Sequence, residues 1–135
     1  MAKFEMRKTI LMLGLVAISN GAMADWIALG GNDVQDNYID SSTINRSGSI
    51  VSATGLYDFK QPREFNGNDI RSSLVRYKFD CDRERYTSIE SISYAGNMAD
   101  DAVADSWIPL TVWKVVIPAT PLGNIFHYAC RKAFP

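Results

Sequence analysis

The chain has 135 residues, of which 14 are basic and 15 acidic, so its formal net charge at neutral pH is -1. Such a chain lacks the strongly basic surface typical of nucleic-acid-binding proteins, and we expect no nucleic-acid partner. Apolar residues make up 47% of the sequence, which is enough to form the core of a single domain.

The first 24 residues have the order of a secretory signal peptide. Basic residues precede an apolar run over residues 10–18, and the small residues Ala22 and Ala24 lie just before the predicted cleavage point. This run is about half of the roughly 20 residues needed to cross a bilayer, so a membrane anchor is the weaker interpretation. We predict an exported protein, periplasmic or released or held at the cell surface, whose single domain spans residues 25–135.

Alternating apolar and polar residues predict strands along most of this domain. The clearest alternation places Val75, Tyr77 and Phe79 on one side of a strand and Arg76 and Lys78 on the other. The expected strands, in chain order, are 26–29, 37–44, 50–59, 73–81, 86–94 and 110–117.

Turn residues separate these strands. Gly48 indicates a turn before the strand 50–59, and residues 61–68, which include Pro62 and Gly67, indicate a connecting loop. Residues 95–106 are rich in aspartate and are expected to form a solvated loop. Gly55 lies inside a predicted strand, which indicates either a bulge or a close approach of another segment.

The period changes from two to 3.6 near the carboxyl end. Thr120 is a suitable N-cap and Pro121 is suited to the first helical position. Apolar residues then follow at helical spacing: Leu122, Ile125, Phe126, Ala129 and Cys130. We therefore expect an α+β fold, in which a short amphipathic helix packs on a small antiparallel sheet of about six strands.

The exported domain contains two cysteines, Cys81 and Cys130, and we predict that they form a disulfide bond. Each lies on the predicted apolar face of its own element, strand or helix. The alternative, a metal site, is disfavoured because the sequence contains one histidine and no CxxC pair.

Several short motifs in this order resemble the surface-adhesin protein E family of Gram-negative bacteria. They are Tyr38-Ile39-Asp40, residues 56–62, residues 77–81, residues 113–118 and Ala129-Cys130. The resemblance covers almost all of residues 25–135 and implies a six-stranded sheet with a carboxyl-terminal helix tied to it by the disulfide. It also implies a non-enzymatic binding module that contacts extracellular-matrix or serum proteins, such as vitronectin and laminin, or glycans.

The predicted cleavage point departs from this family in one respect. A bacterial lipoprotein carries a lipidated cysteine there, whereas this chain has Ala24-Asp25. We therefore expect no lipid anchor, and the alternative function is that of a periplasmic structural or stress-related protein with no host ligand.

The sequence offers few residues for chemistry. His127 is the only histidine and is expected on the outer face of the helix, so we predict no catalytic residues, no metal and no cofactor. The predicted binding residues are basic: Arg76, Lys78, Arg83 and Arg85. They are suited to a sulfated glycan or an acidic protein segment, although the acidic residues between them also fit a solvated strand face. The sequence leaves the oligomeric state open.

Overall fold

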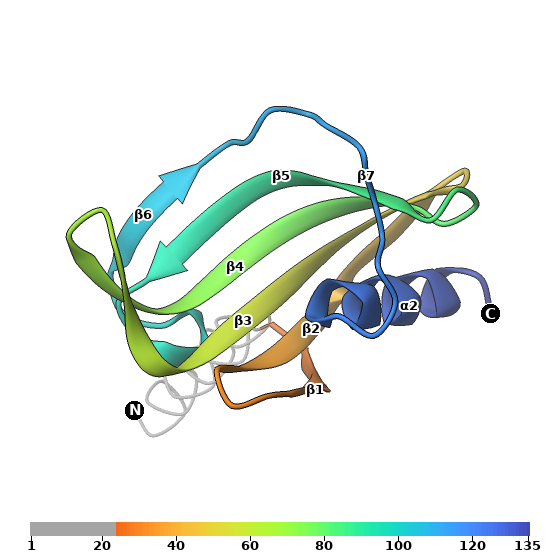
Figure 1. Ribbon diagram of the computed structural model, residues 1–135. Coiled ribbons are helices and arrows are strands. Elements are labelled where there is room, and N and C mark those ends of the chain that lie inside the picture. The colour runs from red at the N-terminus through yellow and green to blue at the C-terminus, as the bar shows by residue number, and fades with distance from the viewer. Residues whose placement is uncertain (1–23) are drawn as a thin grey trace, which may run out of the picture.

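A computed structural model describes residues 24–135, so the predicted signal peptide lies outside the described residues apart from Ala24. Six antiparallel strands follow one another across a single sheet in chain order, and each pairs with the next (Figure 1). These strands are β1 (Trp26–Gly31), β2 (Gln35–Ser47), β3 (Ile50–Phe65), β4 (Asn68–Asp80), β5 (Arg85–Tyr94) and β6 (Val103–Trp107). The remaining elements are the 3-10 turn η1 (Asn97–Ala99), the short strand β7 (Lys114–Val115) and the helix α2 (Pro121–Ala133). The predicted fold class is confirmed.

The predicted loop over residues 61–68 is mostly wrong, because β3 continues to Phe65 and only Asn66 and Gly67 form the turn. β2 pairs with β3 only as far as Phe59, so the end of β3 is an edge strand that pairs with β4 alone. Pro62 lies where the β3–β4 register shifts, between Asp58 and Arg63. A proline is tolerated there because an irregular edge does not need its N–H group.

The predicted solvated loop over residues 95–106 is wrong in part, because it contains the turn η1 and most of β6. The Asp58 carboxylate accepts hydrogen bonds from the Met98 N–H at 2.8 Å and the Asn97 side chain at 3.0 Å, which holds η1 against the sheet. Val103–Trp107 then forms β6 on the edge of β5. Its alternation is weak in sequence, and its strand structure comes from pairing with β5.

The last predicted strand, over residues 110–117, is much shorter in the structure. Only Lys114 and Val115 pair, with Tyr86 and Arg85 of β5. Figure 1 shows the chain leaving β6, bowing away from β5 and returning at β7. Residues 108–113, which we call the strap, therefore form no strand.

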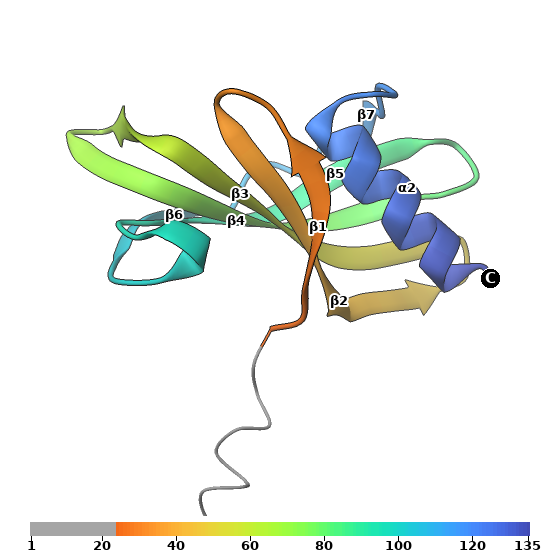
Figure 2. The same ribbon diagram turned by 90° about the horizontal axis from the view of Figure 1, so that it is seen from below.

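Helix α2 begins as predicted. The Thr120 hydroxyl accepts a hydrogen bond from the Gly123 N–H at 3.0 Å, and Pro121 occupies the first turn. Ile125, Phe126 and Ala129 are buried against the inner face of the sheet, where α2 contacts β1, β2 and β3. Figure 2 shows α2 beside β1, with β6 at the far side of the sheet.

Gly55 marks a close approach and not a bulge. It pairs regularly with Ile39 and Val75, and a Cβ atom there would lie 2.8 Å from Cδ1 of Ile125. The absence of a side chain at residue 55 therefore allows α2 to pack closely on β3.

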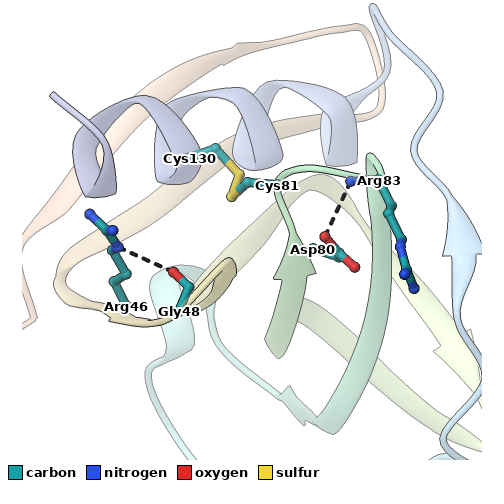
Figure 3. The surroundings of a disulfide bond; sticks show 6 residues. All are labelled: Arg46, Gly48, Asp80, Cys81, Arg83 and Cys130. Carbon is teal, nitrogen blue, oxygen red and sulfur yellow. Dashed lines mark hydrogen bonds between the residues drawn. A yellow bond between two sulfur atoms is a disulfide. The ribbon is translucent and has the colours of Figure 1, made fainter.

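The predicted disulfide is present between Cys81, just after β4, and Cys130 on α2 (Figure 3). The Arg46 guanidinium stacks on the ring of Phe134 at 4.0 Å, which adds a contact between β2 and the end of α2. The helix is therefore attached covalently to the sheet as well as through its apolar face.

Replacing both cysteines, Cys81→Ala with Cys130→Ala, is expected to lower the free energy of unfolding. The bond closes a loop with a sequence separation of 49 residues, and the chain-entropy model gives a loss of about 4 kcal/mol. Urea denaturation measures this change, and reduction of the unaltered protein is the matched control. Free thiols detected on both cysteines in the non-reduced protein would contradict the assignment.

Candidate functional site

The predicted basic residues lie at one end of β4 and β5. Arg76 and Lys78 project from the sheet face opposite α2, and Arg85 joins them because it pairs with Asp80 on that face. Arg83 lies in the β4–β5 turn, where its main-chain N–H donates a hydrogen bond to the Asp80 carboxylate (Figure 3). Arg76 forms an ion pair with Glu90 at 3.4 Å, so its charge is partly compensated. Their role in binding stays a prediction.

His127 lies on the exposed side of α2. It borders a shallow hollow with Leu29, Asn124, Tyr128 and Arg131, and this lining contains neither a carboxylate nor a second histidine. The hollow therefore presents no partner for general acid–base chemistry at His127. Within residues 24–135 no three His, Cys, Asp or Glu side chains gather as a metal site would require.

The strap carries large apolar side chains that remain in contact with solvent. Ile108 is 79% exposed, Leu110 is 88% exposed and Val112 is 53% exposed. Trp107, the last residue of β6, is 55% exposed beside them. Leu110 and Val112 line the same cavity as Trp107, and exposed apolar patches of this kind often mark interaction sites.

Two cavities lie beside Trp107 on the helix side of the sheet, and the strap lines the first of them. The first has a volume of about 540 Å³ and lies between the strap and the β4–β5 surface, with Tyr77, Tyr86, Trp107, Leu110 and Lys114 in its lining. The second, of about 300 Å³, lies toward the β3–β4 hairpin. Both are lined by Ser91 and Trp107, so Trp107 stands between them. The first volume falls within the usual range for small-ligand sites.

A smaller cavity of about 200 Å³ lies on the other side of the strap. Lys78 and Thr87 line it from the sheet, and Ile108 and Trp113 line it from the strap. Thr87 is buried, and its hydroxyl has no hydrogen-bond partner among the described residues. Unpaired buried hydroxyls are uncommon, which distinguishes this section of β5 from the rest of the sheet.

Two tyrosines meet where the helix-covered part of the sheet gives way to the first cavity. The hydroxyls of Tyr57 and Tyr77 are 2.6 Å apart, and Tyr77 lines the cavity. Burial raises the pKa of Tyr57 to about 12. Burial, together with the neighbouring Tyr57, also raises the pKa of Tyr77 well above its usual range. Both hydroxyls are therefore protonated at neutral pH.

Sequence reasoning did not predict this site. It predicted a strand over residues 110–117, whereas in the structure only Lys114 and Val115 pair and most of these residues are exposed. One signal was present: Ile108, Leu110 and Val112 alternate with Pro109 and Thr111. Because a proline does not donate to a strand ladder, Pro109 argues against a regular paired strand at this point.

Comparison with known proteins identifies one family. A family model described as surface-adhesin protein E matches residues 26–131. A structure of Haemophilus influenzae protein E has 18% identity and a TM-score of 0.61, over 82% of this chain and 87% of that chain. A structure of protein E from non-typeable Haemophilus influenzae has 18% identity and a TM-score of 0.57, over 82% of this chain and 78% of that chain. No curated protein matches significantly. At these identities the structural likeness establishes the fold alone.

The tyrosine pair predicts a loss of stability in alkali. Folding raises the pKa of Tyr57 from 10.0 to about 12. Above pH 10 the unfolded chain therefore loses this proton more readily than the folded protein does. Its stabilisation is complete below about pH 10 and falls as the pH approaches 12, by about 1.4 kcal/mol per pH unit for each such tyrosine. Urea denaturation between pH 8.5 and pH 11 measures this slope.

Tyr57→Phe is expected to reduce the slope. Tyr128→Phe is the matched control, because Tyr128 lies on α2, is only partly buried and takes no part in the pair. An unchanged slope in Tyr57→Phe would show that the pair does not carry the effect.

Proposed function

The chain belongs to the surface-adhesin protein E family, and we propose that it is an exported, non-enzymatic binding module that uses the strap and its flanking cavities to hold a host protein. The proposed partners are extracellular-matrix or serum proteins such as vitronectin and laminin. None of the helices within residues 24–135 is long and apolar enough to cross a membrane.

The observation that carries this proposal is the exposure of the strap. Ile108, Leu110 and Val112 present apolar surface beside Trp107, which borders two cavities. Binding interfaces concentrate their energy in a few large apolar or aromatic anchors next to pockets. Trp107 and Leu110 have the size, exposure and position of such anchors.

The basic residues provide a second candidate contact. Arg76, Lys78, Arg83 and Arg85 are exposed, and Lys78 also lines the small cavity behind the strap. We include them as a proposed site for a sulfated glycan or an acidic segment of the same host protein. Because exposed charges contribute little affinity each, the strap is the principal contact.

A double variant, Ile108→Ser with Leu110→Ser, is expected to bind immobilised vitronectin or laminin at least tenfold more weakly. This corresponds to a loss of about 1.4 kcal/mol in binding free energy. The measurement is saturable binding of the mature protein at physiological salt. Val34→Ser is the matched control, because Val34 is 53% exposed in the β1–β2 connection, away from the strap. A third variant, with Lys78, Arg83 and Arg85 changed to glutamine, tests the basic residues. Absence of saturable binding by the unaltered protein would contradict the proposed partners.

The alternative function is that of a periplasmic protein without a host ligand. It is favoured by Ala24-Asp25 at the predicted cleavage point, where a lipoprotein would have a cysteine, and localisation tests it. A host-binding role predicts that protease added to intact cells cleaves the protein or that the protein is released into the medium. Cell fractionation and surface proteolysis measure this. Protein that is confined to the periplasm and protected from added protease would support the alternative.

A further inference from the structure

A buried carboxylate lies beside the first residue of the predicted mature chain. Asp40, in β2, is only 7% exposed. Its Oδ1 atom accepts hydrogen bonds from the Asp25 main-chain N–H at 3.0 Å, the Ser42 main-chain N–H at 3.1 Å and the Ser42 hydroxyl at 2.6 Å. Within residues 24–135 no basic side chain forms a salt bridge with Asp40. Because a buried charge is costly unless it is paired, this carboxylate needs a cation.

An irregular stretch of β2 fixes the position of the Asp40 carboxylate. The register between β2 and β3 shifts between Asp40 and Asn45, as at a β-bulge. Inside this stretch the Thr43 hydroxyl donates to the Asp40 carbonyl at 2.7 Å and accepts from the Thr54 N–H at 3.0 Å. Bulges commonly redirect a side chain. Here the side chain of Asp40 is directed to the nitrogen of Asp25, at the start of β1.

Asp25 is held at this point by two further hydrogen bonds. Its carbonyl accepts from the Ser41 N–H at 3.0 Å, and its carboxylate accepts from the Ser41 hydroxyl at 2.7 Å. The next residue, Trp26, pairs with Asp40 in the ladder between β1 and β2. Chain ends are usually poorly ordered unless such contacts hold them. The nitrogen of residue 25 therefore has a defined place beside the carboxylate.

The sequence predicts a cut at this nitrogen, because Ala22 and Ala24 have the small-residue spacing that precedes a signal-peptide cleavage point. Hydrolysis by a signal peptidase breaks the peptide bond between Ala24 and Asp25. The hydroxyl of water goes to the Ala24 carbonyl carbon, and its hydrogen goes to the Asp25 nitrogen. The new α-amino group then takes up a proton at neutral pH, since such groups have a pKa of about 7.7–8.0. A neutral N–H thus becomes an ammonium group.

We propose that cleavage after Ala24 completes the fold, because the new amino terminus of Asp25 forms an ion pair with the buried Asp40 carboxylate. The inference goes beyond the proposed function and shares with it only the predicted export. A charge-assisted hydrogen bond is roughly twice as strong as a neutral one. The ion pair holds the start of β1, whose Ile27 and Leu29 pack against the core. The uncleaved chain makes the same hydrogen bond without the charge and is therefore less stable.

The first test identifies the amino terminus of the exported protein. Intact-mass measurement and amino-terminal sequencing of protein recovered from the periplasm or the medium are expected to show Asp25 as the first residue. Any other first residue overturns the proposal, because the ammonium group would then not lie beside Asp40.

A double-mutant cycle tests the ion pair itself. Urea denaturation at neutral pH compares the mature protein, a form that retains residues 20–24, and the Asp40→Asn variant of each. The extension keeps the N–H of Asp25 but removes its charge. We expect it to increase the equilibrium constant for unfolding by about fivefold. With Asp40→Asn, the extension is expected to change this constant by less than about twofold. Equal effects of the extension in both backgrounds overturn the proposal.

Asp33→Asn is the matched control, because Asp33 is exposed in the β1–β2 connection and forms no salt bridge among the described residues. In this variant the extension is expected to keep its full effect. Amide hydrogen exchange needs no substitution and is expected to be slower at residues 26–28 in the mature protein than in the extended form. Equal exchange rates in the two forms overturn the proposal, even where Asp40→Asn does not fold.

The outcomes separate this inference from the proposed function. Mature protein that begins at Asp25 and shows the coupling to Asp40, but binds neither vitronectin nor laminin, supports the ion pair and refutes the proposed partners. Protein that binds a host protein but begins at another residue leaves the proposed function standing and refutes the ion pair.

Discussion

The rest of the structure depends on the packing of helix α2 on one half of the sheet, where the Cys81–Cys130 bond fixes it. A helix of 13 residues is marginal alone in water, so α2 is stabilised by its apolar face and by the covalent link. Ile125, Phe126 and Ala129 bury the inner surface of β1, β2 and β3. Gly55 permits this close approach, because a side chain there would collide with Ile125.

The position of the helix divides the inner face of the sheet into two unequal environments. Under α2, which also covers Phe79 of β4, the face is a closed core, whereas over the neighbouring part of β4 and β5 the strap lies above a cavity of about 540 Å³. The Tyr57–Tyr77 pair lies at the boundary. The apolar surface available to a partner is therefore the part of the sheet that a single short helix does not reach.

The strap is held at both ends but not along its length. β6 and β7 both pair with β5, at Ser91–Tyr94 and at Arg85–Tyr86. The strap, residues 108–113, therefore faces only the segment Thr87–Glu90 of β5. The strap is two residues longer than this segment. This excess prevents a continuous ladder and makes the segment bow outward. The bow leaves Ile108 and Leu110 in solvent and the Thr87 hydroxyl without a partner.

Local sequence patterns determined the fold class, the alternation of β4, and the N-cap at Thr120 with the helix that follows it, because each depends on residues close in sequence. They also determined the pairing of Cys81 with Cys130, because each cysteine lies on the apolar face of a regular element. The same patterns did not define β6, the short β7 or the strap. Whether Val103–Trp107 forms a strand, and whether Leu110 is buried, depends on the edge of β5 that faces away from β4 and on how far α2 extends across the sheet. These are spatial relations between segments remote in sequence, so only the tertiary structure decided where the exposed apolar surface lies.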